Sequence, residues 1–424
     1  MSTTAAAKLS HVYPMGARVN ERGRLELGGC DAVELAREFG TPAYVVVEQD
    51  LRARARAAAD ALASRHADGE VLFATKAFPC QAVLRIIAAE GLGCEVASGG
   101  ELALAIAAGI EPARVFMHGN ASSERELREA LRAGVGHVVL DSMHELRLLQ
   151  ELACELGVRQ RVLVRVTPDV HGRTHEKIST GQADSKFGFS MHEARDAIKR
   201  LHAARALELV GLHCHIGSQI LELEPFAAAV QALAGLGEFD IYDLGGGLGV
   251  AYTADQSAPD IERWVQVLVD AAHRALGDRP RLLIEPGRAL VANSTVTLYT
   301  VQSVKRNVST WVAVDGGMSD NLRPMLYGAR YEAALADRPL AAGGERCHVV
   351  GKHCESGDVL VRDARLPDPA PGDVLVTPVT GAYGHAMANN YNCAPRPPVV
   401  IVGEGRARVA VRRETYADMM AREL

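Results

Sequence analysis

A lysine that follows a short apolar run is the first residue of this chain suited to covalent chemistry. Val71–Ala74 has the pattern of a buried strand, and Lys76 comes two residues after its end. An amine held at the mouth of a buried strand is partly desolvated, which lowers its pKa and frees it to attack a carbonyl carbon. A surface lysine at a strand end is the alternative, so the interpretation depends on which groups share its surroundings.

Three further groups suited to chemistry follow apolar runs later in the chain. The run Gly245–Gly247 could point backbone N–H groups at a phosphate, although a tight structural turn explains it equally well. Glu285 needs a cationic partner, either a protonated ring nitrogen or the neighbouring Arg288. His213 and His215 could each be a core residue, and no metal site is predicted because nothing supplies the remaining ligands at a plausible spacing.

Eight apolar runs, mostly separated by amphipathic helical stretches, must position these groups. This alternation predicts an α/β fold with a parallel sheet, and eight units predict a closed (β/α)8 TIM-like barrel, with an open doubly wound sheet as the alternative. The expected strands are Val71–Ala74, Gly93–Ala97, Arg114–Met117, His137–Leu140, Arg161–Val166, Leu209–His215, Phe239–Leu244 and Leu282–Ile284.

Polar or special residues stand at nearly every carboxyl end of these strands. In a barrel these ends converge on one face, which is where active sites form. The residues are Lys76, Glu95, His118, Asn120, Asp141, Arg165, His215, Gly245–Gly247 and Glu285. A lysine amine, a carboxylate, a flat histidine ring and a glycine run on one face together suit pyridoxal 5′-phosphate (PLP), whose protonated ring is a strong electron sink.

The remainder of the chain predicts a second, β-rich domain. Short alternating stretches at 294–301, 311–314, 359–361, 374–376, 399–402 and 408–411 favour a β-sandwich or β-barrel. We expect residues 1–40 to join this β domain, residues 41–289 to form the barrel, and residues 290–424 to complete the β domain. The irregular stretch 167–189 is long enough for a lid or binding loop, or for a disordered surface loop.

Composition narrows the classes of function. The net charge of −6 is spread over interspersed acids and bases, so neither nucleic acid nor a membrane surface is an expected partner. No apolar run is long enough to span a bilayer. The eight cysteines form no CxxC pair, and the start of the chain lacks the apolar core of a signal peptide, so a cytoplasmic location is expected.

Ordered motifs along the chain resemble the fold type III (alanine-racemase-fold) amino-acid decarboxylases, and within them the diaminopimelate decarboxylase family. The resemblance runs from about Gly40 to the C-terminus. In the barrel region its motifs are Phe73–Lys76, Ser98–Glu101, His118–Asn120, His215–Gln219, Asp243–Gly247 and Glu285–Arg288. In the β region they are Val314–Asp320, Arg323–Tyr327, Gly351–Asp358 and Gly381–Gly384.

The resemblance implies a role for each matching residue. Lys76 would carry PLP, His215 would stack on its ring, and Glu285 would pair with the ring nitrogen. The other implied cofactor contacts are Ser218, Gly245, Gly246, Gly247, Gly287, Arg288 and Tyr383. The implied contacts to the distal end of the substrate are Arg288, Arg323, Tyr327, Glu355 and Tyr383. Cys354, a plausible proton donor, and Glu355 would reach the site of a neighbouring subunit, so a homodimer with shared sites is implied.

The implied reaction is decarboxylation of meso-2,6-diaminopimelate to L-lysine and CO2, the last step of lysine biosynthesis. Sister decarboxylases acting on ornithine, arginine, carboxynorspermidine or a specialised amino acid are the main alternative, but diamine-type substrates lack the distal carboxylate that two arginines would bind. A racemase or a non-catalytic homologue fits the residues less well. Two departures from the family pattern are Glu95, where aspartate is usual, and the composition of His385–Tyr391.

Overall fold

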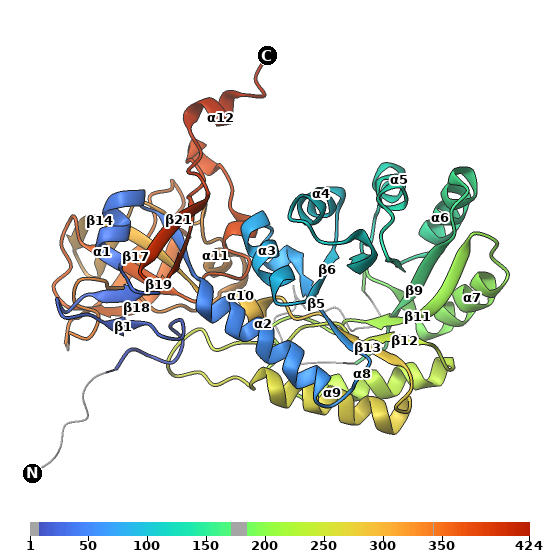
Figure 1. Ribbon diagram of the computed structural model, residues 1–424. Helices are drawn as coiled ribbons and strands as arrows, with labels where there is room; N and C mark the ends of the chain where they lie inside the picture. Colours follow the sequence, from blue (N-terminus) through green and yellow to red (C-terminus); the bar gives the residue numbers. More distant parts are fainter. Residues whose placement is uncertain (1–7, 171–184, 342) are drawn as a thin grey trace, which may run out of the picture. The chain divides into compact units, whose positions relative to one another are not determined.

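The computed structural model describes residues 8–170, 185–341 and 343–424, which fall into two compact units (Figure 1). The barrel unit comprises Arg54–Val250 and Ala258–Ala289. The β unit takes in the chain up to Ala53, the short stretch Ala251–Ser257, and Leu290–Leu424. The domain boundaries given above stay a prediction.

Eight parallel strands of the described residues form a closed barrel. They hydrogen-bond in the order β9-β11-β12-β13-β5-β6-β7-β8, and β8 pairs again with β9 to close the ring. The strands are β5 (Gly69–Ala74), β6 (Gly93–Val96), β7 (Val115–Met117), β8 (His137–Leu140), β9 (Gln160–Thr167), β11 (Leu207–Cys214), β12 (Ile241–Asp243) and β13 (Arg281–Ile284). The predicted barrel is confirmed, and the open doubly wound alternative is wrong.

Apolar side chains make these runs into strands that are buried on both faces. One buried cluster takes a side chain from seven of the eight strands: Leu72, Phe116, Val139, Leu163, Val210, Ile241 and Leu283. Helices alternate with the strands along the chain, as a parallel sheet requires. They are α2 (Glu48–Ala63), α3 (Gln81–Ala89), α4 (Gly99–Ala107), α5 (Glu124–Ala133), α6 (Met143–Leu156), α7 (Met191–His202), α8 (Glu224–Leu233), α9 (Ile261–Ala275) and α10 (Arg288–Val291).

Local signals set where the barrel helices begin. Ser98, Ser123, Ser142 and Ser190 are N-caps whose hydroxyls each accept a hydrogen bond from the backbone N–H three residues later. These caps fix the loops that follow β6, β7 and β8, and so the places of the polar residues at those strand ends.

The β unit contains a nine-stranded mixed sheet within the described residues. Strand β4 (Ala43–Val47) pairs antiparallel with β14 (Thr295–Arg306) and parallel with β20 (Val399–Gly403). The predicted fold class, a barrel plus a β domain that takes in an N-terminal part of the chain, is therefore confirmed, although β4 lies within the range expected for the barrel. The other strands of this sheet are β15 (Thr310–Val314), β16 (Ala334–Leu335), β17 (Glu345–Val350), β18 (Val359–Leu366), β19 (Val374–Pro378) and β21 (Arg406–Val411).

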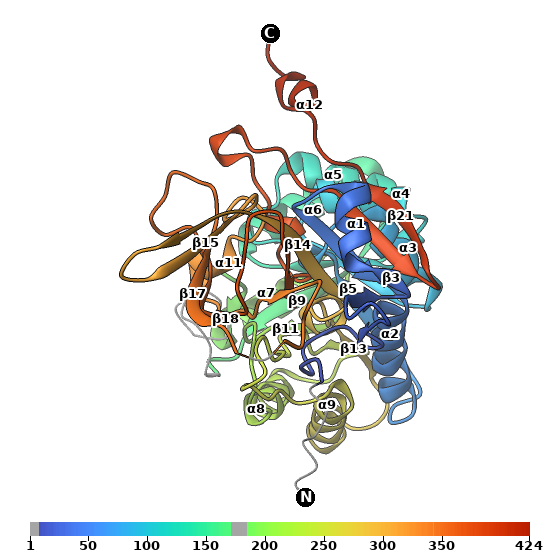
Figure 2. The same cartoon turned by 90° about the vertical axis from the view of Figure 1, so that its left-hand side faces the viewer.

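Strand β17 was not among the expected strands of the β unit. Strand β17 begins with Glu345-Arg-Cys-His348, a polar stretch that hides its pairing with β15 and β18, which Figure 2 shows beside it. The short helices α1 (Ala32–Phe39), α11 (Arg323–Tyr327) and α12 (Tyr416–Met420) complete the unit, together with a small sheet of β1 (Arg18–Val19), β2 (Leu25–Leu27) and β3 (Cys30–Asp31).

The predicted loop 167–189 is described only at its two ends. Thr167 ends β9, and β10 (Phe189–Ser190) pairs with β9 on the return of the chain. Just before β10, the Gly188 N–H donates to Asp141 Oδ1 at 2.9 Å. Residues 171–184 lie outside the described residues, so the lid function stays a prediction. Among the described residues, no helix has the length and apolar character needed to cross a membrane.

Candidate active site

The predicted lysine lies at the carboxyl end of the barrel strand β5. The strand is buried from Val71 to Ala74, and Lys76 lies in the 3₁₀ turn η1 (Thr75–Ala77) that follows it. The Lys76 Nζ lies 2.5 Å from Oε1 of Glu95 in the neighbouring strand β6. The lysine side chain is 38% exposed and the glutamate 1% exposed, so the pair joins an accessible amine to a buried carboxylate.

Glu285 is the centre of a buried cluster of acids and histidines. It follows β13, and its two oxygens lie 2.9 Å from His118 Nε2 and 3.2 Å from His213 Nε2. Burial alone would raise the pKa of Glu285, but these two histidines hold the pKa well below its usual range. Burial also lowers the pKa of His213 to about 4. Glu285 is therefore an anion at neutral pH, and His213 is a neutral donor to it.

Asp243, the last residue of β12, belongs to the same cluster. Burial, and then the negative charge of Glu285, raise the pKa of Asp243 well above its usual range. Its Oδ1 accepts the Gly245 N–H at 3.0 Å, while its Oδ2 is buried without a hydrogen-bond partner among the described residues. One side-chain nitrogen or oxygen from each of four residues lies within 4.8 Å of the others, and these residues are His118, His213, Asp243 and Glu285. The cluster therefore offers one carboxylate charge to a cationic group.

His215, just after β11, presents a neutral ring at this face. Its Nδ1 accepts the Gly246 N–H at 3.2 Å, so that nitrogen carries no proton. Burial, and then the nearby charge of Lys76, lower the pKa of His215 well below its usual range. A neutral, oriented imidazole can pack flat against an aromatic ring.

The glycines after β12 are required by close backbone contacts. A Cβ on Gly245, Gly246 or Gly247 would lie 2.3, 2.1 or 2.3 Å from the carbonyl oxygens of Cys214, Glu285 and Gly217, respectively. The N–H groups of Gly245 and Gly246 are already bonded to Asp243 and His215. The Gly247 N–H has no such partner within the described ranges, so it is the amide of this run best placed for a phosphate.

Arg288 and Ser218 also meet in the barrel unit. The Arg288 Nη2–H donates to Ser218 Oγ at 2.9 Å, and the arginine is 6% exposed. Gly287, the residue before it, packs against β5, because a Cβ there would lie 2.8 Å from the Ala74 Cβ. The structure therefore places the predicted site residues of the barrel at the same strand ends as Lys76. They are His215, Ser218, Gly245–Gly247, Glu285, Gly287 and Arg288. Asn120, which was also predicted at a strand end, is exposed.

Within the β unit, Arg323 is a buried cation among tyrosines. It begins α11 and is 4% exposed. Its Nη1–H donates to the Tyr331 hydroxyl at 2.5 Å, and its guanidinium lies 4.4 Å from the centre of the Tyr252 ring. No carboxylate of the described residues forms a salt bridge with it, and its Nε is buried without a partner there. Tyr327 ends the same helix, one turn further on.

The loop between β17 and β18 carries Cys354 and Glu355, both exposed. Asp358, at the end of this loop, accepts the N–H groups of His353 at 3.0 Å and Met318 at 2.7 Å. Elsewhere in the β unit, Tyr383 has a positive φ of 63°. The structure thus gives the positions of the predicted site residues within the β unit. That they act together with the barrel residues in one active site stays a prediction.

Three residues of the cluster had no assigned role in the sequence interpretation. His118 was noted as a polar strand end and inside a motif, His213 was interpreted as a possible core residue, and Asp243 appeared only inside a motif. Sequence position did contain a signal, because all three end barrel strands on the face of Lys76. Their convergence on Glu285 depends on strand register, which the sequence does not display.

Comparisons with known proteins agree with this geometry. Residues 48–292 match the family described as "Pyridoxal-dependent decarboxylase, pyridoxal binding domain". The chain is 48% identical to a diaminopimelate decarboxylase of Actinosynnema pretiosum subsp. auranticum, over 97% of this chain and 95% of that protein. It is 43% identical to the Bacillus subtilis diaminopimelate decarboxylase, over 96% and 97%.

A solved structure is similar over nearly the same length. It is the diaminopimelate decarboxylase of M. jannaschii in complex with L-lysine, with a TM-score of 0.90 and 34% identity. The match covers 96% of this chain and 97% of that one.

Proposed function

The chain belongs to the pyridoxal-dependent decarboxylases, and within them to the diaminopimelate decarboxylase family, and we propose how its own residues perform that reaction. It is a PLP-dependent carboxy-lyase that converts meso-2,6-diaminopimelate to L-lysine and CO2, a step of lysine biosynthesis. Amino-acid chemistry at this fold is supported by the L-lysine bound in the M. jannaschii relative.

The residues of the barrel face fit PLP. The anionic Glu285 supplies a partner for a protonated ring nitrogen, in a cluster whose Asp243 Oδ2 is buried without a partner among the described residues. The glycine run packs too closely on backbone carbonyls to carry any Cβ, and its Gly247 N–H has no hydrogen-bond partner within the described ranges, so that amide can serve a phosphate. When bound, PLP supplies a sink for the electron pair left as the bond to the α-carboxylate breaks.

We propose that Lys76 carries the cofactor and that Glu95 positions the lysine amine. The 2.5 Å contact to a buried carboxylate gives the displaced ammonium a fixed place while substrate occupies the site. Glu285 holds a proton at the ring nitrogen, and His118 and His213 keep Glu285 anionic. His215 packs on the ring, and Ser218, Gly247 and Arg288 hold the phosphate end.

One observation supports the choice of substrate: Arg323 is buried and has no acid partner among the described residues. A desolvated guanidinium without a carboxylate is unfavourable unless a ligand supplies one. We propose that the distal carboxylate of diaminopimelate supplies it, with Tyr327, Tyr383 and Arg288 as further contacts. Ornithine and arginine have no such carboxylate.

Replacing Arg323 tests this proposal. Arg323→Lys keeps the charge and loses the paired N–H donors, so one charge-assisted hydrogen bond of about 1.5–3 kcal/mol is lost. KM for diaminopimelate should rise roughly 10- to 150-fold. The control is Arg330→Lys, an exposed arginine of the same unit that pairs with Asp255. A wild-type KM for Arg323→Lys would contradict the proposed role.

We further propose a homodimer in which Cys354 and Glu355 enter the partner's site. The two side chains are exposed on a loop that Asp358 holds in place, as residues presented to a second subunit must be. Cys354 would then donate the proton that replaces CO2, and Glu355 would bind the distal ammonium.

We also propose a cytoplasmic location. The eight cysteines, all within the described ranges, are free, and free cysteines are typical of a reducing compartment.

A further inference from the structure

We propose that Tyr391 and Asn392 are positioning residues for Glu355 and Cys354. The inference rests on the roles proposed above for that glutamate and that cysteine. It concerns contacts that lie entirely within the β unit. It also assigns a function to the end of the 385–391 stretch, whose composition departs from the family pattern, and to the residue that follows it.

Tyr391 fixes the carboxylate of Glu355. Its hydroxyl donates to Glu355 Oε1 at 2.5 Å. The hydrogen bond to Glu355 raises the pKa of Tyr391, so the hydroxyl keeps its proton and remains a donor. With Oε1 engaged by Tyr391, the other carboxylate oxygen of Glu355 is the one left for a ligand. An exposed glutamate would otherwise sample several rotamers, and binding an ammonium would require ordering it first.

Asn392 fixes the backbone at Cys354. Its Oδ1 accepts the Cys354 N–H at 3.2 Å and lies 3.2 Å from His353 Nδ1. His353 is itself held at its other ring nitrogen, which lies 2.8 Å from Ser319 Oγ. If Asn392 Oδ1 accepts from both neighbours, the proton of His353 is on Nδ1, and the Ser319 hydroxyl donates to Nε2. One side-chain amide thus ties the cysteine to a buried anchor.

The backbone around Asn392 is shaped for this contact. Asn392 and Cys393 have φ angles of 54° and 53°, a left-handed conformation that asparagine tolerates better than most residues. The preceding residues pin the bend, since the Asn389 N–H donates to the Ser319 carbonyl at 2.9 Å. The Asn390 Nδ2–H donates to Glu414 Oε2 at 2.5 Å.

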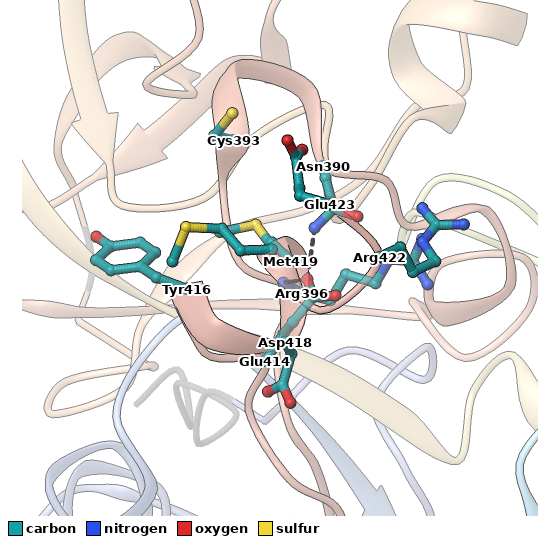
Figure 3. A pocket seen from close by; sticks show the side chains of 10 residues that line it. Asn390, Cys393, Arg396, Glu414, Tyr416, Asp418, Met419, Arg422 and Glu423 are labelled. Carbon is teal, nitrogen blue, oxygen red and sulfur yellow. Dashed lines mark hydrogen bonds between the residues drawn. The ribbon is translucent and has the colours of Figure 1, made fainter.

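Because of this bend, the outer and the middle residues of the stretch 390–393 face different surroundings. Asn390 and Cys393 line a cavity of about 640 Å³ beside the C-terminal helix α12 (Figure 3). Tyr391 and Asn392 do not line it, and instead contact the loop that carries Cys354 and Glu355. Tyr391 and Asn392 therefore form their hydrogen bonds with the loop that carries Cys354 and Glu355. A segment that served only to pack against α12 would not need these contacts.

Three substitutions distinguish the loss of these hydrogen bonds from a general disturbance of the fold. Tyr391→Phe removes only the hydroxyl. Asn392→Gly tolerates the positive φ but removes the acceptor, whereas Asn392→Asp tolerates it and keeps an acceptor oxygen. Tyr416→Phe is the control, because Tyr416 is exposed in the same unit. All are studied as PLP-loaded full-length protein.

We expect Tyr391→Phe to weaken L-lysine binding, measured by calorimetry, about fivefold to tenfold, and to raise KM with kcat nearly unchanged. Asn392→Gly should lower kcat about tenfold with little change in KM. It should also speed hydrogen exchange of the Cys354 amide at least severalfold, and Asn392→Asp should restore both. Wild-type lysine affinity in Tyr391→Phe, or wild-type exchange and kcat in Asn392→Gly, would overturn the corresponding assignment.

Two reference variants distinguish a failure of the positioning roles of Tyr391 and Asn392 from a failure of the roles proposed for Glu355 and Cys354. If Glu355→Gln and Cys354→Ala impair binding and turnover while the positioning variants do not, the further inference is wrong and the proposed roles stand. If Glu355→Gln and Cys354→Ala leave both unchanged, the proposed roles fail and the inference falls with them. Loss of exchange protection throughout the β unit in Asn392→Gly and Asn392→Asp alike would show a purely structural role.

Discussion

Replacing Gly246 by alanine tests whether the glycine run holds a phosphate or only turns the chain. A Cβ at this position would lie 2.1 Å from the Glu285 carbonyl oxygen, about 1 Å closer than the 3.0 Å limit below which real Cβ contacts essentially never occur. Both segments in contact are backbone, so neither can move aside as a side chain would. The glycine run and Glu285 must therefore separate.

The expected cost follows from this overlap. Overpacking of a tight contact costs about 1–3 kcal/mol. Because the run and Glu285 are proposed to hold opposite ends of the cofactor, the affinity for PLP should fall roughly 5- to 150-fold. The control is Gly100→Ala, where the nearest atom, Ser98 Oγ, is 3.8 Å from the new Cβ.

The assay is a titration of the cofactor-free variants with PLP, followed by visible absorbance, beside urea unfolding of the same cofactor-free proteins. We expect weaker PLP binding for Gly246→Ala and wild-type binding for Gly100→Ala. A variant that loses 1–3 kcal/mol of unfolding free energy yet binds PLP normally would refute the phosphate role and leave only a structural turn.

Three further results are expected. Lys76→Ala should abolish both activity and the visible absorbance of lysine-bound PLP, and an active variant would refute the assignment of Lys76. Mixed dimers of Lys76→Ala with Cys354→Ala should regain part of the activity, because one of the two shared sites keeps both groups; well-formed mixed dimers without activity would argue against shared sites. His137 is buried against Phe116, and burial lowers its pKa to about 4. The unfolded chain binds this proton near pH 6.5, so stability falls as the pH drops from about 6.5 to 4, by about 2 kcal/mol at pH 5. His137→Phe should remove that part of the loss in urea unfolding at pH 7.5 and 5, and an unchanged loss would contradict it.

Much of the fold follows from local sequence. The barrel strands are short apolar runs, and the residues that matter stand at their carboxyl ends, so Lys76, His215 and Glu285 could be placed on one face before any contact was known. Helix starts at Ser98 and Ser123 are equally local, because a capping side chain acts on the next turn.

The rest depends on contacts between distant segments. The approach of His118 and His213 to Glu285 reflects the register of three separate strands, and the use of the Gly245 and Gly246 amides by Asp243 and His215 reflects the shape of one turn. The contacts of Tyr391 and Asn392 join segments almost forty residues apart. Hydrophobic periodicity carries no information about such pairings.

The most direct test of the proposed function is CO2 release by the purified, PLP-loaded protein with meso-2,6-diaminopimelate, ornithine, arginine and lysine as separate substrates. We predict release from diaminopimelate alone, with one L-lysine formed per CO2. Release from ornithine or arginine in preference to diaminopimelate, or no release from any of the four by the loaded protein, would contradict the assignment.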